Sequence, residues 1–123
     1  MKRITICSSL RFKDLIRKII ADFRVIGIEA EFPNLESGLS KDDLTLPLME
    51  TIEEAHFKSI DNAEAIYVLD PQGYVGILVS AEIGYATGKR KPVYFSEKAN
   101  TLDLDAMATG YIAQGEIEKF IEL

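Results

Sequence analysis

The chain has 123 residues, of which 47% are hydrophobic and 28% are charged, and its formal net charge is -6. This length fits one domain, residues 1–123, with a hydrophobic core of its own. The acidic balance argues against nucleic acid polymers as partners, because binding to a phosphate backbone requires clustered cations.

The chain contains a single cysteine, Cys7, which can form no internal disulfide. A reducing, cytoplasmic compartment is the natural expectation. The N-terminal residues MKRITICSSL are too short and too β-like for a signal peptide. No apolar run approaches the roughly 18 residues that a membrane span needs. One histidine and one cysteine also make a structural zinc site unexpected, so no metal is predicted.

The N-terminal third predicts a strand, a helix and a second strand. Residues 2–7, KRITIC, are typical of a short β-strand, and the turn residues Ser8 and Ser9 follow. A helix is predicted next because apolar residues recur at helical spacing. These positions are Phe12, Leu15, Ile16, Ile19, Ile20 and Phe23. Gly27 is a plausible stop, and residues 28–32, IEAEF, predict the second strand.

Residues 33–46, PNLESGLSKDDLTL, predict a long loop because Pro, Asn, Gly, Ser and Asp dominate them. Long loops in compact domains are often lids or subunit contacts. Pro47 suits the first turn of a helix. That helix carries one stripe of mostly apolar residues: Leu48, Met49, Ile52, Ala55, His56 and Ile60.

The C-terminal half continues the alternation of strands and helices. Residues 65–70, AIYVLD, are almost continuously apolar, as expected for a strand buried on both faces. Further elements are predicted over 78–88 (helix), 92–96 (strand), 110–112 (short strand) and 115–123 (closing helix). This alternation favours a three-layer α/β sandwich, with a flavodoxin-like parallel sheet of four to five strands and helices on both faces. Ligands of such sheets bind beyond the carboxyl ends of the strands.

Polar candidates follow three of the predicted strands: residues 7–9, 70–76 and 96–97. Glu82 is expected in the first turn of the next helix, where free N–H groups and the helix dipole would hold its carboxylate ionised. An ionised carboxylate suits a nucleophile, but acidic residues in first turns often only complement the dipole. Gly73 and Gly76 could cradle a phosphate or simply permit turns.

Three motifs follow one another in the second half of the chain: DPQGYVG, SAEIGYA and GKRKPVYF, all after the AIYVLD strand. In this order they resemble the nucleoside 2-deoxyribosyltransferase-like family, and the resemblance extends from ITICSS to about KPVYF. It implies cleavage or transfer of the N-glycosidic bond of a (deoxy)nucleoside or nucleoside 5′-monophosphate. No cofactor is implied. The resemblance further implies at least a homodimer, in which neighbouring subunits complete the pocket.

The resemblance assigns Glu82 as the nucleophile that attacks the anomeric carbon and forms a glycosyl-enzyme ester. Such a carboxylate would also stabilise the oxocarbenium-like transition state. His56 stands where the family has a carboxylic acid, and it could protonate the leaving base or simply pack at the edge of the core. Asp61 is a weaker acid candidate. The substrate-binding residues would be Cys7, Ser8, Ser9, Arg11, Asp70, Gly73, Tyr74, Gly76 and Ser80.

Some residues of the sequence favour, or argue against, other functions. Ile77, Leu78 and Val79 stand where many relatives have hydroxyl residues, which favours a nucleotide- or nucleoside-binding module without turnover. A purely structural role, with the 33–46 loop as a contact, is a third possibility. A receiver domain is rejected because Cys7 and Ser8 replace the required acids. Dinucleotide binding is rejected because no G-x-G-x-x-G turn follows the first strand. A Cys7–His56 nucleophilic dyad lacks a third member.

Overall fold

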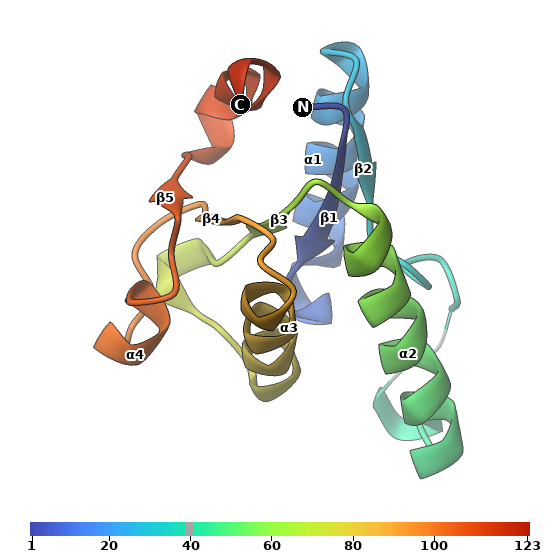
Figure 1. Ribbon diagram of the computed structural model, residues 1–123. Coiled ribbons are helices and arrows are strands. Elements are labelled where there is room, and N and C mark those ends of the chain that lie inside the picture. Colours follow the sequence, from blue (N-terminus) through green and yellow to red (C-terminus); the bar gives the residue numbers. More distant parts are fainter. Residues whose placement is uncertain (39–40) are drawn as a thin grey trace.

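A computed structural model describes residues 1–38 and 41–123. Its centre is a five-stranded parallel sheet in the order β2-β1-β3-β4-β5 (Figure 1). The strands are β1 Arg3–Cys7, β2 Glu29–Glu31, β3 Ala65–Val68, β4 Val93–Phe95 and β5 Gly110–Tyr111. This is the flavodoxin-like strand order, so the predicted fold class is confirmed. The order reverses between β1 and β3, which makes their carboxyl ends the expected ligand edge.

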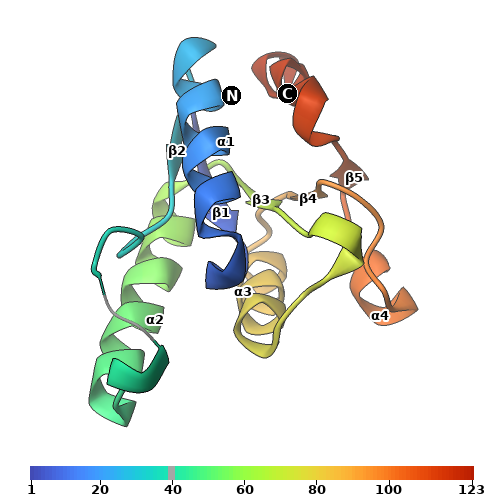
Figure 2. The same ribbon diagram turned by 180° about the vertical axis from the view of Figure 1, so that it is seen from behind.

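Helices cover both faces of the sheet. They are α1 Lys13–Val25, α2 Leu46–Asn62, α3 Ile77–Gly88 and the short α4 Leu102–Asp105. Figure 1 shows α1 behind the sheet and Figure 2, seen from the other side, shows it in front, so α1 lies on the face opposite α2 and α3. The 3₁₀ segments are η1 Leu10–Phe12, η2 Lys41–Asp43, η3 Pro71–Gly73 and η4 Gln114–Glu122. The segment η4 packs on the same face as α1, through Phe120 and Ile117.

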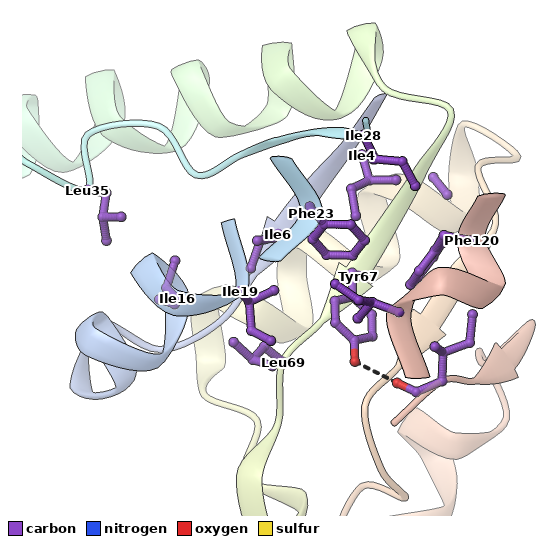
Figure 3. Close-up of a cluster of buried hydrophobic side chains, with 13 residues drawn as sticks. Ile4, Ile6, Ile16, Ile19, Phe23, Ile28, Leu35, Tyr67, Leu69 and Phe120 are labelled. Atoms are coloured by element: carbon purple, nitrogen blue, oxygen red, sulfur yellow. Dashed lines mark hydrogen bonds between the residues drawn. The ribbon is translucent and has the colours of Figure 1, made fainter. Parts of the chain in front are cut away.

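The alternation of side chains along β1 divides the core into two layers. Ile4 and Ile6 join the cluster beneath α1, whereas Cys7 joins the cluster beneath α2 and α3. Tyr67 of β3 lies at the centre of the first cluster, with its ring edge-on to Phe23 and Phe120 (Figure 3). Its hydroxyl donates a 2.6 Å hydrogen bond to the Ile112 carbonyl. The site residues that come from β1, α2 and α3 therefore share the second layer.

Some predicted elements differ from the observed ones. The closing helix predicted over 115–123 is wrong in type, because η4 is a 3₁₀ segment with non-helical backbone at Glu116. The short helix α4 was not predicted. The loop predicted over 33–46 contains η2 and the start of α2, and its residues 39 and 40 lie outside the described residues. Within residues 1–38 and 41–123, none of the helices combines the length and apolar character that a membrane crossing requires.

Candidate functional site

The candidate site lies beside the carboxyl end of β1, on the α2 and α3 face of the sheet. Cys7 is the last residue of β1, His56 comes from α2 and Glu82 from α3. His56 Nε2 lies 3.3 Å from Glu82 Oε1 and 3.6 Å from Cys7 Sγ. We call these three residues the Cys7–His56–Glu82 cluster. The fold thus brings together three residues that are far apart in the sequence and were each predicted to belong to the site.

The cluster is buried. Cys7 is fully buried, and the side chains of His56 and Glu82 are only 5% and 6% exposed. The Phe32 ring lies edge-on to the His56 imidazole, with centroids 5.2 Å apart. Despite its burial and its closeness to His56, Glu82 Oε1 is not aligned for a hydrogen bond and has no partner. Buried polar atoms are rarely left unpaired, so this oxygen requires a functional or chemical explanation.

Two expectations for Glu82 are wrong. No acidic residue lies in the first turn of α3, which begins at Ile77, so Glu82 lies in the second turn. Its carboxyl is also not held ionised: burial raises the pKa of Glu82 to about 10, and a hydrogen bond with Glu53 adds to the rise. The helix dipole acts mainly on the first turn, so it does not offset the cost of burying a charge one turn further on.

The other two members of the cluster are also driven toward neutral forms. Burial raises the pKa of the Cys7 thiol well above its usual value, and Glu82 adds to this effect. Burial lowers the pKa of His56, against the opposing influence of nearby carboxylates such as Glu53. At neutral pH the cluster is therefore a thiol, a neutral imidazole and a carboxylic acid. The three side chains can release protons when a ligand binds, but without a ligand the cluster carries no net charge.

Sequence reasoning missed Glu53. This residue lies one helical turn before His56 on α2, so both side chains reach the same region. Glu53 lies close enough to Glu82 to raise the pKa of that carboxyl, and Glu53 Oε1 is itself buried without a hydrogen-bond partner. The signal available in the sequence was its spacing of three residues from His56. The apolar stripe of the same helix concealed this signal, because such a stripe indicates packing against the sheet.

Access to the cluster is closed in this conformation. Two surface hollows of about 600 and 280 Å³ lie along α1 and β2, and Glu82 lines neither of them. Phe32 lines the larger hollow and also contacts His56. Because the three residues of the cluster are at most 4% exposed, a ligand reaches Glu82 only after side chains around the cluster move, and Phe32 is placed to be one of them.

Asp70 forms a second buried polar group at the same sheet edge. It is fully buried, and its Oδ1 accepts hydrogen bonds from Ser96 Oγ at 2.8 Å and from the Glu97 amide at 3.1 Å. Its Oδ2 is buried and has no partner. Burial raises the pKa of Asp70 to about 6, although both hydrogen bonds oppose the rise. Asp70 thus joins the ends of β3 and β4.

Other predicted binding residues are engaged in holding the loops. Ser8 Oγ donates to the Leu69 carbonyl at 2.7 Å, and Ser80 Oγ donates to the Gly76 carbonyl at 3.0 Å. Gly73 has a positive φ of 76°. A Cβ there would lie 2.5 Å from Asn100 Oδ1, so this glycine closes against a neighbouring loop.

The loops after β1 and β3 meet through an aromatic and cationic contact. The Arg11 guanidinium lies 4.0 Å from the centroid of the Tyr74 ring. Phe12 lies edge-on to the same ring. Ser9 caps η1 by accepting from the Arg11 amide. The structure therefore brings Arg11 and Tyr74 together, with Arg11 exposed to solvent, where an anion could reach it.

Among the described residues, the donor atoms of Cys7, His56 and Glu82 all lie within 4.8 Å of one another. Sulfur, nitrogen and carboxylate donors at this spacing could hold a divalent metal ion. The chemistry available to the cluster is therefore of two kinds. It can move a proton to or from a group held beside the Glu82 carboxyl, or it can release protons and bind a metal.

Comparisons with known proteins show the fold. No family model matches the chain, and no curated protein matches it either. Among solved structures, a 2-deoxyribosyltransferase from Bacillus psychrosaccharolyticus superposes with a TM-score of 0.72 at 14% identity, covering 94% of this chain and 90% of its own. The CMP N-glycosidase BcmB of Clostridium botulinum superposes with a TM-score of 0.59 at 14% identity, covering 98% of each chain.

A conserved protein from Enterococcus faecalis V583 gives a TM-score of 0.66 at 12% identity, covering 98% of this chain and 99% of its own. Identities this low establish a shared fold. The expected nucleoside 2-deoxyribosyltransferase-like fold is therefore confirmed, and it extends over nearly the whole chain.

Proposed function

We propose that this protein cleaves or transfers the N-glycosidic bond of a (deoxy)nucleoside or nucleoside 5′-monophosphate. The observation that carries the proposal is the buried Glu82 carboxyl, whose Oε1 lies 3.3 Å from His56 Nε2, at the strand edge where ligands of such sheets bind. Two structural neighbours support it, since one is named a 2-deoxyribosyltransferase and the other a CMP N-glycosidase.

In the proposed reaction, a Glu82 oxygen bonds to the anomeric carbon as the bond from that carbon to the base nitrogen breaks. The departing base needs a proton, and the neighbouring carboxyls of Glu82 and Glu53 hold one, because burial and Glu53 raise the pKa of Glu82. We infer that this proton passes to the base through Glu53 or His56, which leaves Glu82 free to form the ester. Water or a second base then takes the sugar and restores the proton to the pair.

The remaining residues would bind and position the substrate. Arg11, exposed beside Tyr74, would hold a 5′-phosphate, and Asp70 would lie at the sugar. Cys7, Ser8, Ser9, Gly73, Gly76 and Ser80 would form the surrounding wall. A homodimer and a cytoplasmic location belong to the same proposal. Exposed Ile77 and Leu46 support the first, and the unpaired thiol of Cys7 supports the second.

The test is release of free base from nucleosides and nucleoside 5′-monophosphates by chelator-treated protein. Glu82→Ala should abolish release. Glu53→Gln should slow release of ordinary bases about 100-fold or more, in the range of general acid catalysis. It should slow N7-methylguanine release far less, because that base leaves without needing a proton. Glu54→Gln, an exposed residue of the same helix, is the matched control.

A nucleotide- or nucleoside-binding module without turnover is the second candidate. The burial of Glu82 and its raised pKa favour this alternative, because both oppose nucleophilic attack. The same samples decide between them. Saturable nucleoside binding by wild-type protein without any base release would establish the module, whereas equal release by wild type and Glu82→Ala would overturn the nucleophile.

A further inference from the structure

Two separations among the donor atoms of the Cys7–His56–Glu82 cluster match those of a metal coordination shell, and all three donors lie within 4.8 Å of one another. Zinc binds thiolate sulfur at about 2.3 Å, imidazole nitrogen at about 2.0–2.1 Å and carboxylate oxygen at about 2.0–2.2 Å. With tetrahedral angles these lengths separate sulfur from nitrogen by about 3.6 Å and nitrogen from oxygen by about 3.4 Å. The observed separations are 3.6 Å from Cys7 Sγ to His56 Nε2 and 3.3 Å from His56 Nε2 to Glu82 Oε1.

The surroundings of the three donors also suit a metal. Glu82 is 4% exposed, and its Oε1 faces the cluster without a hydrogen-bond partner. The backbone of Ile6 lies beside the His56 ring, where an outer contact would orient a metal-binding histidine. Glu53 lies beside Glu82, outside this set of three, and would orient the carboxylate in the same way.

We propose that Cys7, His56 and Glu82 form a three-ligand site for a thiophilic divalent cation such as Zn²⁺, with the fourth position open. The sequence-based expectation of no zinc site counted only histidine and cysteine, whereas here a carboxylate supplies the third ligand. Binding converts the thiol to a thiolate and the carboxylic acid to a carboxylate. Two protons leave to solvent, and the two negative ligands balance the charge of the ion, so the buried site remains neutral.

The metal site does not depend on the glycosidic activity. If the protein has both the metal site and the glycosidic activity, the two share Glu82. A bound ion then occupies the oxygen that would attack the sugar. Zinc would then inhibit base release in competition with the nucleoside. The protein would bind substrate at Glu82 only in its metal-free form.

The test uses the chelator-treated full-length protein, kept reduced with a phosphine and titrated with Co²⁺ in the absence of nucleoside. We expect one equivalent to bind, with a thiolate-to-cobalt charge-transfer band in the near ultraviolet that Zn²⁺ removes. About two protons should be released per ion in weakly buffered solution. Cys7→Ser should abolish the band, and Glu82→Gln should weaken binding at least about 100-fold, beyond the usual effect of an outer-shell change. Glu54→Gln should bind as wild type does.

The absence of a thiolate band in wild-type protein would overturn the proposal, as would unchanged Co²⁺ affinity in Glu82→Gln. His56→Asn removes another ligand and serves as a second variant if Cys7→Ser does not fold. Because no nucleoside is present, failure here leaves the proposed glycosidic function untouched. If metal-free protein releases no base, the Co²⁺ binding result is not affected.

Discussion

Replacing Glu82 by glutamine should stabilise the protein at neutral and alkaline pH. The buried carboxyl keeps its proton in the folded state, because its pKa rises from 4.5 to about 10. The unfolded chain loses the same proton above about pH 4.5. Between pH 4.5 and about 10 the folded state therefore binds one more proton than the unfolded state. Its stability falls as the pH rises above 4.5. Glutamine has the shape of the protonated acid and carries no such linkage.

As long as the pKa of Glu82 in the folded protein lies above the pH, the stability difference between wild type and Glu82→Gln depends only on how far the pH lies above the unfolded pKa. At pH 7.5 the interval from 4.5 is 3 units, and each unit is worth about 1.36 kcal/mol. The upper limit is therefore about 4 kcal/mol in the free energy of unfolding, and the difference should vanish near pH 4.5. The amide group of glutamine can donate to Glu53 as the acid does, so the hydrogen bond is kept.

The measurement is urea unfolding of wild type and Glu82→Gln at pH 5 and pH 7.5, without metal ions. Glu54→Gln, on the exposed face of α2, controls for the loss of one negative charge. A stabilisation that is equal at both pH values, or a variant less stable than wild type at pH 7.5, would refute the reasoning. Either result would mean that the folded protein keeps Glu82 ionised.

Two further predictions concern the framework around the site. Gly73→Ala should destabilise the protein by about 2 kcal/mol or more, because its φ is positive and the new Cβ would lie 2.7 Å from the Lys98 carbonyl oxygen. Gly84→Ala, in the open interior of α3, should instead stabilise it by up to about 1 kcal/mol in the same thermal unfolding assay. Tyr67→Phe should lower the free energy of unfolding by about 1–2 kcal/mol, since it leaves the Ile112 carbonyl without its buried donor. Tyr94→Phe, at a half-buried position, should lower the free energy of unfolding in denaturant much less.

The amino-acid sequence by itself determined the order and type of the main elements. The helical spacing of Ile16, Ile19 and Phe23 and the apolar run of residues 65–70 are local signals, and the structure confirms both elements. The alternation of strands and helices then restricts the topology, because parallel strands require crossovers. The closing segment, residues 114–122, was harder to predict because its apolar residues suit a 3₁₀ segment as well as an α-helix.

Only the tertiary structure decided the charge state of Glu82 and which side chains lie next to it. Its pKa depends on burial and on Glu53, which lies 29 residues earlier in the sequence and on another helix. The distances among Cys7, His56 and Glu82 likewise arise from three elements packed on one face of the sheet. Propensity and periodicity act over a few neighbouring residues, whereas desolvation and electrostatic coupling act between residues that only the fold brings together.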